Sequence, residues 1–182
     1  GLWIRESLSA EEFVERTKKW AFNEKTLLPL VELVQGRVET LTDILPLSGF
    51  MFSGMLNLSQ SDFEHKKLEV GQVKRVLQFT LWTLEAQRHW SKDTIFTDIK
   101  LLAKVMALKL GEFMQPIFVA IAGTPDSWSV VESMDKLGPD MTRARLRHAV
   151  NVLEGFSKKE TKKVEKEYQA ILKKLAEEES EK

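Results

Sequence analysis

Residues 71–88 read GQVKRVLQFTLWTLEAQR, and their apolar side chains recur at steps of three and four residues. An α-helix has about 3.6 residues per turn, so this spacing places the apolar side chains on one face of a helix. The residues on that face are Val73, Val76, Leu77, Leu81 and Leu84. A long apolar stripe of this kind has to be buried against other elements. The stretch therefore predicts a helical domain built around it.

Similar spacing occurs before this stretch. Ser9 and Glu12 have the spacing of a capping box at a helix start, and residues 27–44 carry a second apolar stripe. Gly36 interrupts that stripe, and glycine costs a helix about 1 kcal/mol relative to alanine, so we expect a bend there. Residues 49–61 combine turn formers with large apolar side chains and are predicted to form a packed loop.

More helices are expected in the second half of the chain. Ser91 or Asp93 can cap one of them, and Ser127 or Ser129 can cap another, which closes at residues 138–139 with Gly-Pro. A further helix is expected to run from there to about residue 153. The run 116–122 is almost wholly apolar, and periodicity alone does not separate a buried strand from a buried helix there.

The last part of the chain has a different composition. Residues 157–182 are rich in Lys and Glu at i,i+4 spacing, which predicts a charged C-terminal helix. We expect an all-α fold of two packed helical subdomains, over residues 1–60 and 61–156, followed by this helix over 157–182.

Composition excludes several classes of protein. The 27 basic and 27 acidic residues cancel, cysteine is absent, and the three histidines lie far apart in the sequence. Disulfides and thiolate metal sites are therefore impossible, and no metal site is expected. No apolar run approaches the roughly 20 residues of a membrane span, so we expect no membrane partner. The absence of cysteine fits a reducing cytosol, and we expect a cytoplasmic protein and a monomer. The first residue is Gly1 rather than Met, which indicates a piece of a longer chain.

No catalytic residue can be assigned from the sequence. It contains no glycine-rich phosphate loop, no nucleophile elbow and no H-E-x-x-H pair. Residues 133–136 superficially resemble an ATP loop but continue a helical apolar pattern. We therefore expect no cofactor in this piece. Composition and pattern by themselves favour a helical binding or scaffold module.

A set of short motifs resembles, in the same order, the C-terminal anticodon-binding region of bacterial-type glutamyl-tRNA synthetases. The motifs are Ile4-Arg5, Leu8-Ser9-Ala10-Glu11-Glu12, Gly36-Arg37-Val38-Glu39-Thr40-Leu41, Trp90-Ser91, Lys109-Leu110-Gly111-Glu112-Phe113-Met114-Gln115-Pro116, Ala122-Gly123, Lys136-Leu137-Gly138 and residues 143–153. The resemblance spans roughly residues 2–154 and leaves the charged tail outside it.

This resemblance implies a function as well as a fold. Two helical subdomains would cradle the anticodon of a glutamate-specific tRNA. The ligation of glutamate to that tRNA, with ATP and Mg²⁺, would take place in an upstream part of the parent chain, so this piece would be inactive alone. The alternative from another class is a helical protein-interaction or scaffold domain with no role in RNA binding.

The resemblance also assigns Arg37 to the third anticodon base. Guanidinium donors match the acceptors O2 and N3 on the pairing edge of cytosine, whereas guanine presents donors there. The alternative is that Arg37 pairs with a nearby carboxylate, Glu39 or Asp43.

The other candidate positions follow in the second half of the chain. Phe118 stands where the family usually has an arginine that contacts the first base. Phenylalanine donates no hydrogen bond, so Phe118 either stacks on a base or belongs to the core. Ser127, Trp128 and Val130 fall on a turn and helix start that line the anticodon pocket. Trp128 departs from the usual Thr-Pro, and would stack on a base or pack half-buried.

A basic stretch gives a weaker indication. Residues 136–166 hold nine Lys or Arg against four Asp or Glu. Such a stretch is typical of a solvated helix face. Its arginines Arg143, Arg145 and Arg147 either contact phosphate or form such a face.

Overall fold

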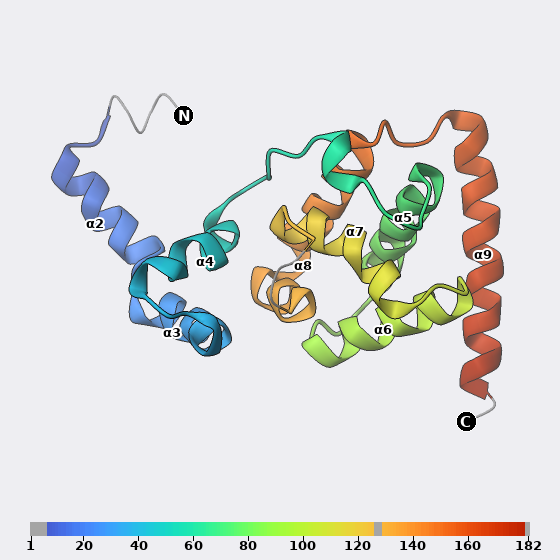
Figure 1. Cartoon of the computed structure of the whole chain (residues 1–182), viewed down its shortest axis with the longest axis horizontal. Coiled ribbons are helices and arrows are strands. Elements are labelled where there is room, and N and C mark those ends of the chain that lie inside the picture. Colours follow the sequence, from blue (N-terminus) through green and yellow to red (C-terminus); the bar gives the residue numbers. More distant parts are fainter. Residues whose placement is uncertain (1–6, 126–128, 181–182) are drawn as a thin grey trace. The chain divides into compact units, whose positions relative to one another are not determined.

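The computed structural model describes residues 7–125 and 129–180, and every regular element within these ranges is helical. The predicted all-α fold is confirmed. The chain divides into two compact units, Gly1–Phe52 and Ser53–Lys182. The first unit holds α2 (Ala10–Trp20), α3 (Glu24–Val34), η1 (Gln35–Arg37), η2 (Leu41–Asp43) and α4 (Ile44–Phe52). The second holds η3 (Gln60–Phe63), α5 (Val70–Ala86), α6 (Lys92–Val105), α7 (Leu110–Ala122), α8 (Val130–Val152) and α9 (Lys158–Ser180), as Figure 1 shows.

The first helix of the first unit begins as predicted. The Ser9 backbone N–H donates to the Glu12 carboxylate at 3.0 Å, and the Glu12 N–H donates to Ser9 Oγ at 3.2 Å. These two bonds satisfy donors that have no partner inside a helix. The helix buries no residue, and the apolar side chains Phe13 and Val14 are about half exposed, at 49% and 48%.

The prediction for residues 27–44 is partly correct: the stretch is helical up to Val34 and is interrupted at Gly36 as expected, but residues 38–40 are not helical. The helix α3 ends at Val34, a single 3₁₀ turn follows, and Val38 is extended at φ −94° and ψ 131°. The Asp43 carboxylate accepts the backbone N–H groups of Glu39 at 3.0 Å and Thr40 at 2.8 Å. Such local bonds compete with helix propagation and start a new turn, η2.

The prediction of a packed loop over residues 49–61 is only partly correct. The helix α4 continues through Gly49 to Phe52, and its buried residues are Ser48 and Phe50. The Ser48 hydroxyl donates to the Ile44 carbonyl at 2.6 Å, so it needs no partner outside the helix. The chain leaves helical structure only after Phe52.

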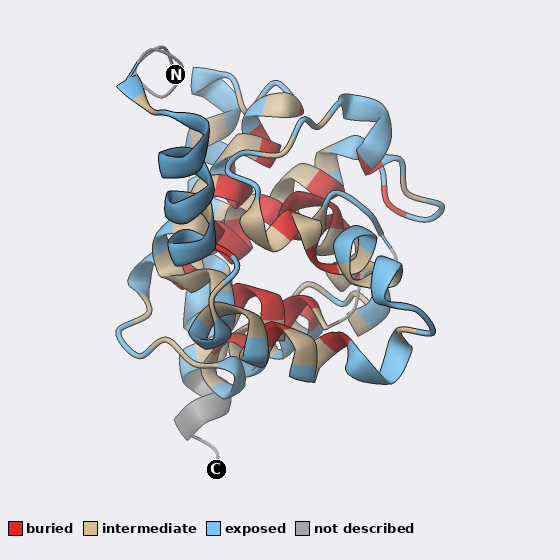
Figure 2. Cartoon of the chain, turned by 90° about the vertical axis from the view of Figure 1, so that its left-hand side faces the viewer, coloured by how far each residue is buried: buried red, intermediate tan, exposed pale blue. Residues whose placement is uncertain are grey.

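The second unit contains the stretch that predicted the fold. The helix α5 buries every member of the predicted stripe, from Val73 to Leu84, together with Phe79 and Thr80. It packs against α6, α7 and α8. Figure 2 shows that buried residues gather on the faces that the helices turn toward one another. Ser91 caps α6 as predicted, because its side chain accepts the N–H of Thr94 at 3.2 Å.

The apolar run 116–122 is helical. It forms the second half of α7, with Pro116 inside the helix and Ile117, Val119 and Ala120 almost inaccessible. The helix ends at Gly123, whose φ of 79° lies in the left-handed region that glycine adopts at no steric cost. The apolar pattern begins before Pro116, and its total length favours a helix over a strand.

The helix α8 is broken at the predicted place. Ser129 caps its start, and Gly138 stands inside it at φ 79° and ψ 171°, outside the helical region. The next residue is Pro139, which lacks the N–H that a continuous helix would use. Two helical segments, 130–137 and 139–152, therefore meet at a sharp bend.

Arg145, on α8, has a structural role, so both predictions for it are wrong. Its side chain is inaccessible to solvent and donates to the carbonyls of Gly54 at 3.1 Å, Ile121 at 2.5 Å and Ser53 at 2.5 Å. Burial lowers the pKa of this guanidinium to about 10, so it stays charged at neutral pH. Arg145 thus fastens the start of the second unit to the end of α7.

The two neighbouring arginines are also engaged. Arg143 donates to the Leu84 carbonyl at 3.1 and 2.7 Å and lies over the Trp90 ring at 5.6 Å. Arg147, which is exposed, pairs with Glu85 at 2.6 Å.

The charged tail is helical, as predicted, and packs on the second unit. In Figure 1, α9 runs alongside α5 and α6. Val164 and Tyr168 are buried, at 1% and 8% exposure, and the Tyr168 hydroxyl bonds with Thr83 at 2.9 Å. Its ring stacks on Phe79 at 5.4 Å and lies tilted over Trp82 at 5.2 Å. This aromatic cluster, Phe79–Trp82–Tyr168, joins the tail to α5.

Candidate nucleic-acid interface

Arg37 is the last residue of η1 and is exposed. It makes no hydrogen bond or ion pair with any residue in the described ranges. The Asp43 carboxylate, one of its expected alternative partners, instead accepts the amides of Thr40 and Glu39, and these bonds lower the pKa of that carboxyl. The five guanidinium donors of Arg37 therefore remain available to a ligand.

Phe118 lies on α7 between the buried residues Ile117 and Val119, but it is only half-buried itself. It shares a half-buried face of the helix with Met114 and Gln115. Part of the ring is therefore accessible, and part of it packs within the unit. Such a ring can stack on a base and cannot donate a hydrogen bond to it.

The start of α8 offers backbone donors rather than side chains. Val130 is its first residue, and its side chain is completely buried. Ser129 Oγ accepts the N–H of Glu132 at 3.4 Å. The N–H groups of Val130 and Val131 have no acceptor within the helix. Val130 can therefore contact a ligand only through its backbone. The two other candidates, Ser127 and Trp128, lie outside the described residues.

The charge at this helix start is balanced by an ion pair. Glu132, in the first turn of α8, pairs with Lys92, and this hydrogen bond raises the pKa of the lysine. Lys92 neutralises the Glu132 carboxylate, which would otherwise offset the partial positive charge at the start of α8. An anionic or carbonyl acceptor is thus favoured near these amides.

The candidate residues come from both units. Phe118 and Val130 belong to α7 and α8, which pack against each other within the second unit. Arg37 belongs to the first unit.

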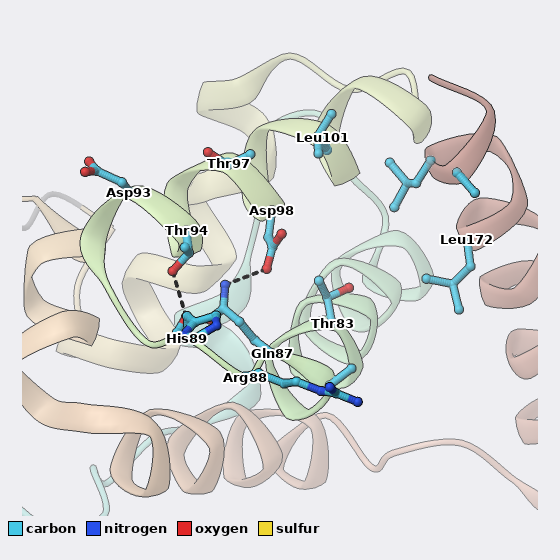
Figure 3. A pocket seen from close by; sticks show the side chains of 13 residues that line it. Thr83, Gln87, Arg88, His89, Asp93, Thr94, Thr97, Asp98, Leu101 and Leu172 are labelled. Atoms are coloured by element: carbon cyan, nitrogen blue, oxygen red, sulfur yellow. Dashed lines mark hydrogen bonds between the residues drawn. The ribbon is translucent and has the colours of Figure 1, made fainter. Parts of the chain in front are cut away.

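An open pocket of about 730 Å³ lies between α5, α6 and α9 and contains none of the candidates. Figure 3 shows its polar side chains: the Gln87 amide donates to Asp98 at 2.8 Å, and the Thr94 hydroxyl donates to the His89 carbonyl at 2.9 Å. Leu101 and Leu172 form part of its apolar wall. Several of its polar side chains are therefore engaged in internal hydrogen bonds, and the residues that line it do not resemble a catalytic site.

None of the helices in the described ranges is both long and apolar enough to cross a membrane. Among residues 7–125 and 129–180, no group of three or more His, Asp or Glu is placed to hold a metal ion.

Residues 12–150 match the model of a protein family described as the anticodon binding domain. Several curated proteins named glutamate–tRNA ligase are similar over nearly the whole chain. The relative from Marinobacter nauticus is 66% identical over 171 residues, which are 94% of this chain and 35% of the relative. Those from Marinomonas sp. and Cellvibrio japonicus are 49% and 48% identical, over 92% and 91% of this chain and 34% and 33% of their own lengths.

These findings bear on the two alternatives drawn from the sequence. The chain spans about a third of the length of the curated relatives it matches. The alternative of a scaffold domain with no role in RNA binding gains no support from them. The match covers 139 of the 182 residues, from α2 to near the end of α8. The chain therefore belongs to the anticodon-binding domain family, and its named relatives are glutamate–tRNA ligases.

Proposed function

We propose that the chain recognises the anticodon of a glutamate-specific tRNA, as the C-terminal part of a glutamate–tRNA ligase. The observation that carries this proposal is the family match across residues 12–150, supported by the names of the relatives. The remainder of the parent enzyme would join glutamate to the tRNA, with ATP and Mg²⁺ as its cofactors. The parent would act as a cytoplasmic monomer, and the piece alone would not charge tRNA.

Arg37 is proposed as the reader of the third anticodon base. Its exposed guanidinium, without a partner in the described ranges, can donate to O2 and N3 of cytosine. Guanine at the same place would present N–H donors to N–H donors. A well-formed contact of this kind discriminates by about 1–3 kcal/mol.

The residues of the second unit would position the anticodon loop. We propose that Phe118 stacks on an unstacked base and that Val130 donates its backbone N–H. Ser127 and Trp128, which stand between α7 and α8 in the sequence, complete the proposed surface, with Trp128 as a second stacking ring. The proposed functional subdomains extend over residues 1–60 and 61–156, with residues 157–182 as an appended helix.

The test is a binding titration of the whole chain with glutamate and glutamine tRNAs at one fixed salt concentration. Arg37→Gln supplies both a donor and an acceptor, so it should accept either base. We expect the preference for glutamate tRNA to fall by about five- to 150-fold. The control is Arg88→Gln, since Arg88 is also exposed and pairs with no described residue. It removes the same charge, and it should leave the preference unchanged.

Two results would count against the proposal. If the unsubstituted chain, and the parent enzyme as well, bind both tRNAs equally, the assignment to anticodon recognition fails. If the preference is present but Arg37→Gln and Arg88→Gln leave it equally intact, recognition stands and the assignment to Arg37 fails.

A further inference from the structure

The tail helix α9 carries three lysines on one exposed face. Lys162, Lys166 and Lys173 are spaced four and seven residues apart, which places them on the same side of the helix. All three are exposed, and none forms an ion pair with a residue whose side chain the structure describes. Within the described side chains of the second unit, no ion pair therefore uses their charge.

These lysines line an open groove of about 840 Å³, together with Trp82 of α5 and Tyr168 of α9. Trp82 is half-buried, and its ring stacks against Phe79 at 6.1 Å and lies tilted over Tyr168 at 5.2 Å. The aromatic cluster thus holds the indole in place while part of it stays accessible. The groove therefore combines an aromatic ring that is held in place with flexible lysine side chains.

Among residues 158–176 of α9, two of the three acidic side chains are directed to other partners. Glu167 pairs with Arg75 at 2.7 Å, and Glu160 accepts the N–H of Ser157 at 2.9 Å at the start of the helix. Glu165 is the acidic residue that lines the groove. The local charge is therefore positive, although the net charge of the whole chain is zero.

We propose that this groove is a second RNA-binding surface, which takes the phosphate backbone of the bound tRNA outside the anticodon loop. Lysines are flexible point charges and suit phosphates, while an exposed indole stacks on a base or ribose without reading sequence. The family match ends at residue 150, before α9 begins, so the lysines of this groove lie outside the matched range and Trp82 lies within it. The inference rests on the proposed function, because it requires tRNA as the ligand.

An acidic protein partner is the competing occupant, and the groove favours it less. Docking of a protein requires a sizeable apolar centre, and Ala170 is the one aliphatic side chain that lines this groove in the described part of the chain. Three lysines without an ion pair among the described side chains, beside the rings of Trp82 and Tyr168, match a nucleic-acid backbone better.

The test uses the complete chain with all three lysines changed to glutamine. The matched control changes three exposed lysines elsewhere, so that the net charge is the same; these are Lys25, Lys66 and Lys100. Binding of glutamate tRNA is measured by anisotropy over a range of salt concentrations, and the bound tRNA is mapped by nuclease protection. Losing three phosphate contacts should reduce the slope of log affinity against log salt by about two. Affinity should fall by about tenfold at about 0.1 M salt.

The pattern of protection distinguishes this inference from the proposed function. We expect Lys162→Gln, Lys166→Gln and Lys173→Gln together to abolish protection outside the anticodon loop and to retain it within the loop. The inference is overturned if this variant binds with the affinity and salt slope of the control, which would leave an acidic protein as the occupant. If even the unsubstituted chain and its parent enzyme fail to protect the anticodon loop, the proposed function is what fails.

Discussion

Arg145 offers the sharpest test of how the second unit is held together. Methionine has a similar length and no donors, so Arg145→Met removes the hydrogen bonds to Ile121, Ser53 and Gly54 while largely preserving volume. The bond to the Ile121 carbonyl is buried, whereas the other two are partly exposed to water.

The expected loss follows from these three acceptors. A buried carbonyl left without a donor costs about 1–3 kcal/mol, and each partly hydrated bond contributes about 0.5–1.5 kcal/mol. The variant also avoids burying a cation, and the lowered pKa of Arg145 shows that this burial is unfavourable. We therefore expect a net loss of about 2–5 kcal/mol in the free energy of unfolding, a large part of the stability of a small unit.

Urea denaturation followed by circular dichroism measures this loss. Arg147→Met is the control, because Arg147 lies two residues further along α8 and makes only an exposed ion pair with Glu85. Such pairs contribute about 0–1 kcal/mol. The reasoning is refuted if Arg145→Met costs less than about 1 kcal/mol or no more than its control. The folded pKa of about 10 is below that of the unfolded chain, so the charge on Arg145 changes only above about pH 9. The difference between the variants should accordingly be constant from about pH 6 to 8.

Three other predictions concern single residues. Gly138→Ala should lower the free energy of unfolding by about 1–3 kcal/mol, because a methyl group there meets no atom within 4 Å and the cost is the backbone strain at φ 79° alone. The control is Gly111→Ala, in α7 without positive φ, which should not destabilise the fold. Equal urea midpoints for the two variants would contradict this reasoning. Arg75 lowers the pKa of Glu167, so this carboxylate stabilises the fold above about pH 4.5 and loses that effect as the pH falls through its lower folded pKa. Glu167→Gln should therefore reduce the loss of stability between about pH 5 and 3 by up to about 1 kcal/mol in acid titrations, and an unchanged pH profile would rule out this contribution. Phe118→Ala should weaken glutamate and glutamine tRNAs by a similar factor in filter binding, because stacking reads no base edge, and a loss confined to one tRNA would be inconsistent with that role.

The sequence was most informative where one physical effect dominated. The stripe of α5 and the caps at Ser9 and Ser91 depend on spacing and on one side-chain bond, and the structure has them as predicted. The boundary errors arose where local hydrogen bonds competed with helix periodicity. The Asp43 carboxylate binds the amides of Glu39 and Thr40 in the non-helical stretch between η1 and η2, and no periodic pattern contains that information.

The residues of the candidate site were harder to predict from sequence spacing. Arg145 has the sequence neighbourhood of a solvated helix face, yet it binds carbonyls more than 20 residues away along the chain. Such long-range partners cannot be read from spacing. The groove beside α9 was missed for a related reason, because its aromatic floor comes from Trp82, on a different helix from its lysines. Arg37 and Phe118 entered through the family resemblance, and their roles stay predictions.

The aromatic cluster that joins α9 to α5 also keeps apolar surface of α5 from water. Phe79 is 2% exposed and Trp82 half-buried, and the Tyr168 ring contacts both, so the tail helix covers part of α5. A chain that ends before this helix would present both rings to water, which favours aggregation. Loss of the tail in evolution should therefore be accompanied by polar replacements at positions 79 and 82. The tail helix and the surface of α5 that it covers should therefore vary together.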